Sequence, residues 1–161
     1  MQKILTLMMV LFFISSPALA GVPKPGDPAP GFTLQSMDEK TVALSSFKGK
    51  VVLIGMFHIC VPCMNQAMQL NKVREQIKSP DLVVLGINTS GDSKEEVANY
   101  LKGFPEPVSF PYLLDPGQTV HKAYIQRDMP TVLIVGKDGI LKARSPAVGA
   151  DQLVPFLKKL L

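Results

Sequence analysis

The chain has 161 residues and carries 17 basic against 13 acidic side chains, so its formal net charge is only +4. The basic residues are scattered singly or in pairs, the sequence has no Trp, and aromatic residues make up 7% of it, which argues against nucleic-acid binding. The length suits one domain with a substantial core.

Residues 1–20 are typical of a cleavable signal peptide. Lys3 supplies the positive start, an apolar stretch runs from Ile4 to Ile14, and Ala18-Leu19-Ala20 offers small residues where a signal peptidase cuts. The apolar stretch falls well short of the roughly 20 residues that a membrane-spanning helix needs. We therefore expect cleavage after Ala20, export to the periplasm, and one mature domain over residues 21–161.

The first half of the mature region predicts a short hairpin, a buried strand and a helix. Phe32 to Leu34 and Thr41 to Leu44 flank a polar turn, which suits a hairpin. Val51 to Phe57 is continuously apolar, as expected of a strand buried on both faces of a sheet. From Cys63 onward apolar residues recur at spacings of three and four, so we expect an amphipathic helix that ends before Pro80.

The second half continues with alternating strands and helices. Ser93 is a good helix cap, and Glu95 and Glu96 suit the positive end of a helix that runs to about Gly103. The other expected elements are a strand over Leu82–Ile87, an extended segment over Phe110–Leu114, a short helix over Gly117–Tyr124, strands over Thr131–Val135 and Ile140–Arg144 joined by a tight turn, and a helix over Leu153–Leu161.

Two cysteines sit in the run Cys60-Val61-Pro62-Cys63, between the expected strand and helix. A disulfide across so small a loop stabilises a fold by only about 2 kcal/mol, so this spacing favours a bond that is made and broken. Free N–H groups and the positive dipole end at a helix N-terminus favour a thiolate at Cys60, the candidate nucleophile. Cys63, one turn on and facing inward, is the candidate resolving thiol, and Pro62 fits the first helical turn.

The same cysteine spacing also occurs at metal and haem sites. Haem attachment needs a His directly after the second cysteine, where this chain has Met64. A zinc site needs four ligands, whereas Cys60, Cys63 and His58 make three and His121 is distant in sequence. A structural zinc site and an inert disulfide stay open as minor alternatives, and so does a copper-binding or metallochaperone module that uses Cys60, Cys63 and His58.

A thiol peroxidase is a second enzymatic alternative, because it uses the same kind of reactive cysteine. Peroxidase chemistry usually needs the pattern P-x-x-x-T-x-x-C, and Leu53 and Phe57 occupy the Pro and Thr positions before Cys60. The sequence therefore favours disulfide exchange over peroxide reduction.

His58 is the least usual residue beside the motif. As an imidazolium it would stabilise a thiolate at Cys60 and make its reactivity depend on pH, whereas the alternative is a solvated side chain that points away. We expect His121 to lie on the surface of a short helix. Met56, Met64 and Met68 are expected to serve packing rather than copper binding.

The sequence resembles the thioredoxin superfamily and, within it, the exported TlpA/ResA-like thiol-disulfide oxidoreductases. The resemblance rests on the lead-in Gly26–Phe32, the segment Leu44–Leu53, the Cys60/Cys63 junction, the insert Phe110–Asp115, and Met129-Pro130-Thr131. It implies a thioredoxin-like α/β fold, in which a central mixed sheet is flanked by helices, with an N-terminal hairpin and a central helix/strand insert.

The resemblance also implies a function and a substrate-binding site. Pro130 is expected to be a cis-proline that faces the disulfide and, with Met129, binds an extended substrate segment. The implied activity is exchange of the Cys60/Cys63 pair with protein cysteines outside the cytoplasm, as a reductant recharged by a membrane thiol carrier, for example in cytochrome c maturation. We expect a monomer without cofactor or metal.

Two departures from the superfamily, at three positions, leave the redox properties open. Relatives usually carry Trp just before the first cysteine, where this chain has Met56 and Ile59. Thioredoxin has a buried acid six residues before that cysteine, and here the position is Ile54. Proton transfer at Cys63 would then need water or Glu106 brought near by the insert. His58, Val61 and Pro62 are expected to tune the reduction potential of the cysteine pair, so the sequence leaves the direction of electron flow open.

Overall fold

The structure is a computed structural model that describes residues 21–161 of the chain. The predicted signal peptide at residues 1–20 lies outside the described residues. Within residues 21–161, no helix combines the length and apolar character needed to cross a membrane.

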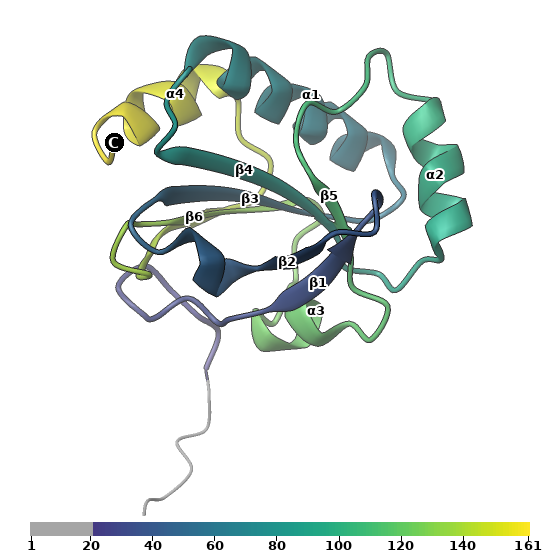
Figure 1. The fold of residues 1–161 in the computed structure, drawn as a ribbon, viewed down its shortest axis with the longest axis horizontal. Coiled ribbons are helices and arrows are strands. Elements are labelled where there is room, and N and C mark those ends of the chain that lie inside the picture. The colour runs from purple at the N-terminus through teal and green to yellow at the C-terminus, as the bar shows by residue number, and fades with distance from the viewer. Residues whose placement is uncertain (1–20) are drawn as a thin grey trace, which may run out of the picture.

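A seven-stranded mixed sheet forms the centre of the domain (Figure 1). Its strands are β1 (Thr33–Ser36), β2 (Thr41–Ala43), β3 (Val51–Phe57), β4 (Leu82–Asn88), β5 (Tyr112–Leu114), β6 (Thr131–Val135) and β7 (Leu141–Ser145). They lie in the order β2-β1-β5-β4-β3-β6-β7. β3 pairs in parallel with β4 and antiparallel with β6, so it is an inner strand, and all of its residues are buried.

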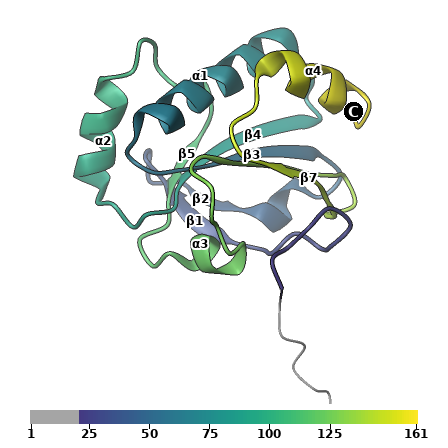
Figure 2. The ribbon, with the colours of Figure 1, turned by 180° about the vertical axis from the view of Figure 1, so that it is seen from behind.

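Helices cover both faces of this sheet. They are α1 (Val61–Gln76), α2 (Lys94–Lys102), α3 (Thr119–Ala123) and α4 (Ala150–Lys158), and a short 3-10 helix, η1 (Leu44–Phe47), follows β2. Figures 1 and 2 show α1 and α4 together over one face and α3 on the opposite face. α2 lies beside the N-terminal end of α1, where the cysteine motif begins (Figure 1).

An apolar core lies on each side of the sheet. On one side, α1 and α4 contribute Ala67, Leu70 and Leu157, which pack against alternate residues of β3. On the other side, Val120 and Tyr124 pack against the remaining β3 residues and the hairpin. The side chains of β3 alternate between these two apolar layers, which explains why the strand contains no polar residue. The burial of β3 on both faces was predicted from its sequence.

The expected order of elements is confirmed, and the differences lie at element ends. α1 begins at Val61, with Cys60 as its N-cap and Pro62 in its first turn, as expected from the cysteine motif. α4 begins at Ala150 rather than Leu153, because Gly149 caps it and the first turn precedes the apolar repeat that signals a helix. The hairpin of β1 and β2 and the insert between β4 and β6 are present as predicted.

A buried carboxylate fixes the start of α3. Asp115 is 1% exposed and accepts hydrogen bonds from the backbone N–H groups of Thr119, Val120 and His121 and from the Thr119 hydroxyl. Helix N-termini leave such N–H groups without intrahelical partners, and a carboxylate is a strong acceptor for them. Asp115 thereby holds α3, and with it His121, against the sheet.

Candidate active site

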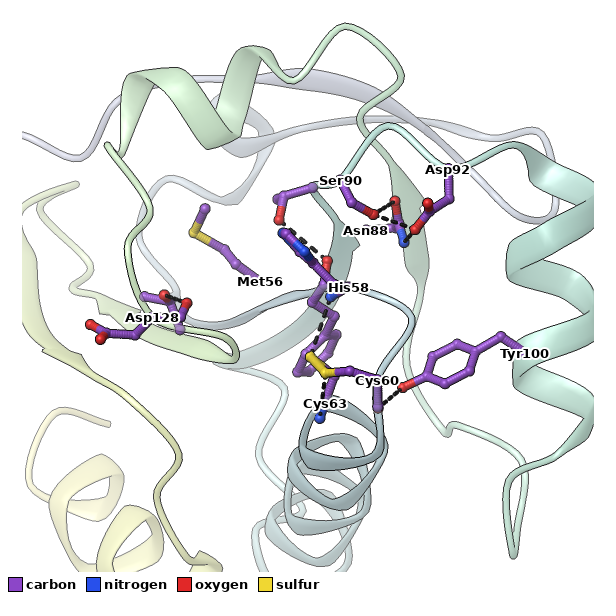
Figure 3. Close-up of a disulfide and its surroundings, with 12 residues drawn as sticks. Met56, His58, Cys60, Cys63, Asn88, Ser90, Asp92, Tyr100 and Asp128 are labelled. Carbon is purple, nitrogen blue, oxygen red and sulfur yellow. Dashed lines mark hydrogen bonds between the residues drawn. A yellow bond between two sulfur atoms is a disulfide. The ribbon is translucent and has the colours of Figure 1, made fainter.

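The cysteine motif forms the junction between β3 and α1. Cys60 has an extended backbone, with φ −155° and ψ 154°, and is the N-cap of α1, with Pro62 in the first turn. Cys60 and Cys63 form a disulfide whose Cα atoms are 5.2 Å apart (Figure 3). The structure therefore places the pair at a strand–helix junction, as the sequence predicted.

The two sulfurs differ in exposure and share backbone donors. Cys63 is 1% exposed, whereas Cys60 is only partly buried. The Cys63 N–H donates to Cys60 Sγ at 3.2 Å, and the His58 N–H donates to Cys63 Sγ at 3.3 Å. An incoming thiol or disulfide can reach Cys60 first, and backbone N–H groups are in place to stabilise negative charge on either sulfur.

Exposed apolar side chains flank Cys60 in the sequence and lie on the loop that carries the cis proline. Ile59, Val61 and Met129 are 42%, 65% and 51% exposed, and two of them are sequence neighbours of Cys60. The Met129–Pro130 peptide bond is cis. Pro130 directly precedes Thr131, which pairs with Met56 in β3, so the Met129–Pro130 loop lies beside the strand end from which the cysteine motif continues.

A buried polar network supports this loop and was not foreseen from the sequence. The Thr89 hydroxyl donates to Gln126 Oε1 at 2.6 Å, and Gln126 Nε2 donates to the carbonyl oxygens of Met56 and Asp128. The Thr131 hydroxyl also donates to the Asp128 oxygen, at 2.6 Å. The network ties the segment before Pro130 to β3 and to the end of β4, although its members are far apart in sequence.

Tyr100 of α2 makes a second contact that the sequence did not reveal, with the backbone of Cys60. Its hydroxyl donates to the Cys60 carbonyl oxygen at 2.5 Å (Figure 3). The signal was weak, because a tyrosine on an exposed amphipathic helix more often packs on the core than reaches a distant backbone group.

His58 matches neither of its two expected roles. Its half-buried ring lies 6.2 Å, between centroids, from the ring of His121, and its Nε2 is buried without a hydrogen-bond partner. Burial, followed by the positive charge of His121, lowers the pKa of His58, and Asp92 opposes the shift. The partly exposed ring is thus disfavoured as an imidazolium, and the hydrogen bond from His58 to a cysteine sulfur comes from its backbone N–H.

Two further expectations are corrected. His121 was expected on the surface, but its Nδ1 is buried without a partner. Glu106 was a candidate for proton transfer at Cys63, but its carboxylate accepts from Asn71 Nδ2 at 3.1 Å. Asn71 follows Cys63 by eight residues in α1, about 12 Å along the helix axis, so Glu106 does not serve the inner thiol.

Ile54, where thioredoxin has its buried acid, is fully buried in an apolar layer. Across residues 21–161, no carboxylate is hydrogen-bonded to either sulfur, and no group of three or more His, Cys, Asp or Glu side chains is arranged to hold a metal ion. Met56 is fully buried, and Met68 packs against the core, as expected of packing residues.

Comparison with known proteins gives a consistent family assignment. The family model for AhpC/TSA proteins matches residues 25–144. The chain is similar to the thiol-disulfide oxidoreductase ResA of Bacillus subtilis, with 30% identity over 71% of this chain and 63% of ResA. It is also similar to bcp of Haemophilus influenzae, a peroxiredoxin by name, with 35% identity over 62% of this chain and 63% of that protein.

A solved structure supports the fold. The thioredoxin domain of a thiol-disulfide oxidoreductase from Bacteroides vulgatus superposes with a TM-score of 0.73 at 22% identity, covering 84% of this chain and 96% of that one. The architecture described above is therefore a thioredoxin-like fold.

The lowered pKa of His58 predicts how stability depends on pH. Because the folded state disfavours the imidazolium, the unfolded chain takes up the proton first as pH falls below about 6.5. Stability should fall from pH 7 toward pH 5, and His58→Asn should flatten that fall. The measurement is the Tm of the oxidised protein across this range.

His121→Asn provides the graded comparison for this prediction. It removes the second cause of the shift, the charge of His121, and leaves the burial of His58, so the fall in Tm should be intermediate. Equal slopes for the parent and His58→Asn would contradict the account.

Proposed function

We propose, because the chain belongs to the AhpC/TSA family of the thioredoxin superfamily, that it is a thiol-disulfide oxidoreductase acting on protein cysteines outside the cytoplasm. The observation that carries the proposal is the Cys60–Cys63 disulfide at the N-terminus of α1, with one sulfur accessible and the other buried. A purely structural bridge would have no need of this asymmetry.

The chemistry in the reducing direction uses both cysteines in turn. The Cys60 thiolate attacks a substrate disulfide, forms a mixed disulfide and releases one substrate thiolate. Cys63, as a thiolate, then attacks Cys60 Sγ, which restores the Cys60–Cys63 bond and releases the second substrate thiolate. Two electrons pass from the pair to the substrate, and the proton lost by Cys63 ends on a released thiol or on water.

Reactivity of Cys60 follows from its place as N-cap. The Cys63 N–H already points at Cys60 Sγ, and the dipole of the 16-residue α1 adds positive potential there. Lowering a thiol pKa from about 8.5 to about 7 raises its thiolate fraction at neutral pH from roughly 3% to roughly 50%. No cofactor is needed for this reaction.

Protein substrates suit the apolar surface around Cys60. Ile59, Val61 and Met129 offer exposed apolar contacts, and the backbone at Met129 and Pro130 is the site proposed to pair with an extended segment next to a substrate cysteine. We propose that the protein acts as a monomer.

Export and the reducing direction are parts of the proposal that rest on sequence. The signal-peptide pattern of residues 1–20 supports a location outside the cytoplasm, in the periplasm. The resemblance to TlpA/ResA-like proteins supports a reductant recharged by a membrane thiol carrier, with cytochrome c maturation as one pathway it could serve.

The alternatives are less well supported. A copper module based on Cys60, Cys63 and His58 would need the His58 ring beside the sulfurs, and that ring lies instead against His121. Peroxidase chemistry would need Pro and Thr where Leu53 and Phe57 stand, and both of these side chains are buried in β3.

The two cysteines should give different phenotypes when changed singly. Cys60→Ser should abolish reduction of insulin disulfides, because the accessible nucleophile is lost. Cys63→Ser should accumulate a mixed disulfide through Cys60, because the resolving thiol is lost. Turbidity and intact mass measure the two effects, and insulin reduction by Cys60→Ser at the parent rate would disprove the proposal.

The apolar surface should matter for proteins and not for small disulfides. Met129→Gln should raise KM for a protein disulfide several-fold while leaving the rate with a small aromatic disulfide unchanged, since only a polypeptide spans the surface. Phe156→Gln is the matched control, because Phe156 is also exposed, at 38%, but lies on α4. Equal effects of the two variants would argue against substrate binding at Met129.

The reduction potential decides the direction of electron flow. In equilibrium with glutathione, a reductant should show a potential near ~−270 mV, whereas an oxidant lies near ~−120 mV. We expect a value close to the first, and a value close to the second would overturn the reducing role while leaving disulfide exchange intact.

A further inference from the structure

Tyr100 connects α2 to the reactive cysteine. Its hydroxyl donates to the Cys60 carbonyl oxygen at 2.5 Å, and the same oxygen accepts from the Met64 N–H at 3.0 Å (Figure 3). The second bond is an ordinary helical one, whereas the first comes from α2, 40 residues further along the chain. The carbonyl oxygen of Cys60, the residue that carries the accessible sulfur, therefore accepts two hydrogen bonds.

The phenol is held in place by its own element. The rings of Tyr100 and Phe104 meet edge to face, with centroids 4.8 Å apart. The start of α2 is fixed by a capping box in which the Ser93 hydroxyl accepts from the Glu96 N–H and the Glu96 carboxylate accepts from the Ser93 N–H. Tyr100 thus presents its O–H from a well-defined helix rather than from a loose loop.

The phenol also stays protonated while Cys60 titrates. Burial raises the pKa of Tyr100 above its ordinary value, which hydrogen bonding to the backbone of Cys60 and Met64 only partly opposes. An ordinary tyrosine titrates near 10, above the range of an activated thiol. The O–H dipole therefore points its positive end at Cys60 throughout the working range.

We propose that Tyr100 is a positioning residue for disulfide exchange, which stabilises the Cys60 thiolate by binding the Cys60 carbonyl oxygen and thereby raises the reduction potential of the cysteine pair. The inference rests on the proposed function. A carbonyl oxygen carries partial negative charge, which disfavours an anion beside it, and a donor on that oxygen reduces this effect. Only the reduced pair carries a full negative charge, so the stabilisation acts mainly on the reduced state.

The test is Tyr100→Phe, which removes the hydroxyl and keeps the ring against Phe104. Because the hydrogen bond is present in the oxidised state as well, its ordinary net strength sets the upper limit of the effect: the pair becomes easier to oxidise by up to about tenfold in equilibrium with glutathione. Tenfold corresponds to a potential about 30 mV more negative. In a Cys63→Ser background, the pKa of the Cys60 thiol should rise by up to about one unit.

Tyr124→Phe is the matched control. Tyr124 is fully buried, its hydroxyl donates to the Pro30 carbonyl oxygen at 2.8 Å, and it lies in the core on the opposite face of the sheet from α1. The change deletes one partly buried phenolic hydrogen bond in both variants. Stability should fall in both, whereas the potential and the thiol pKa should move only in Tyr100→Phe.

The outcomes separate this inference from the proposed function. A parent protein that does not equilibrate with glutathione would overturn the function itself. If the parent equilibrates but Tyr100→Phe matches Tyr124→Phe in both potential and thiol pKa, the inference is overturned. Tyr100 would then serve only to hold α2 in place. A shift toward a more positive potential in Tyr100→Phe would also overturn it.

Discussion

The backbone N–H groups at the first turn of α1 are the feature on which the rest of the site depends. They are free because a helix begins there, and the helix begins there because β3 ends at Phe57 and Cys60 takes the extended conformation of an N-cap. The parallel pairing of β3 with β4 and its antiparallel pairing with β6 fix that strand in the middle of the sheet. The central strand thus fixes the position of the N-terminus of α1, and this helix end stabilises a thiolate at Cys60.

Within residues 21–161, no charged side chain is hydrogen-bonded to either sulfur of the disulfide. The buried acid of thioredoxin is replaced by Ile54, Glu106 is bound to Asn71, and the His58 ring lies against His121. The hydrogen bonds at the motif come from the backbone N–H groups of His58 and Cys63, on the sulfurs, and from the phenol of Tyr100, on the Cys60 carbonyl oxygen. Electrostatic control of this pair is therefore expected to come from fixed dipoles more than from side-chain charges, while the pH dependence that remains is that of the thiols themselves.

How far the sequence could predict this structure depends on whether the signal is local. Val51 to Phe57 could be identified as an inner strand and Cys60 placed at a helix N-terminus, because the apolar run and the helical repeat after it act over a few neighbours. The same patterns could not place Tyr100 on the Cys60 carbonyl or Gln126 on Thr89, because those bonds join residues 40 and 37 apart. Glu106 was misplaced for the same reason: the path of the insert is set by packing.

The most direct test of the account is the alkylation of the reduced protein, followed residue by residue as a function of pH. The account predicts that Cys60 reacts with iodoacetamide along a single titration with a pKa below the ordinary value of about 8.5, while the buried Cys63 reacts far more slowly. Similar rates for the two thiols, or a Cys60 titration at or above about 8.5, would contradict the claim that the end of α1 activates one accessible sulfur.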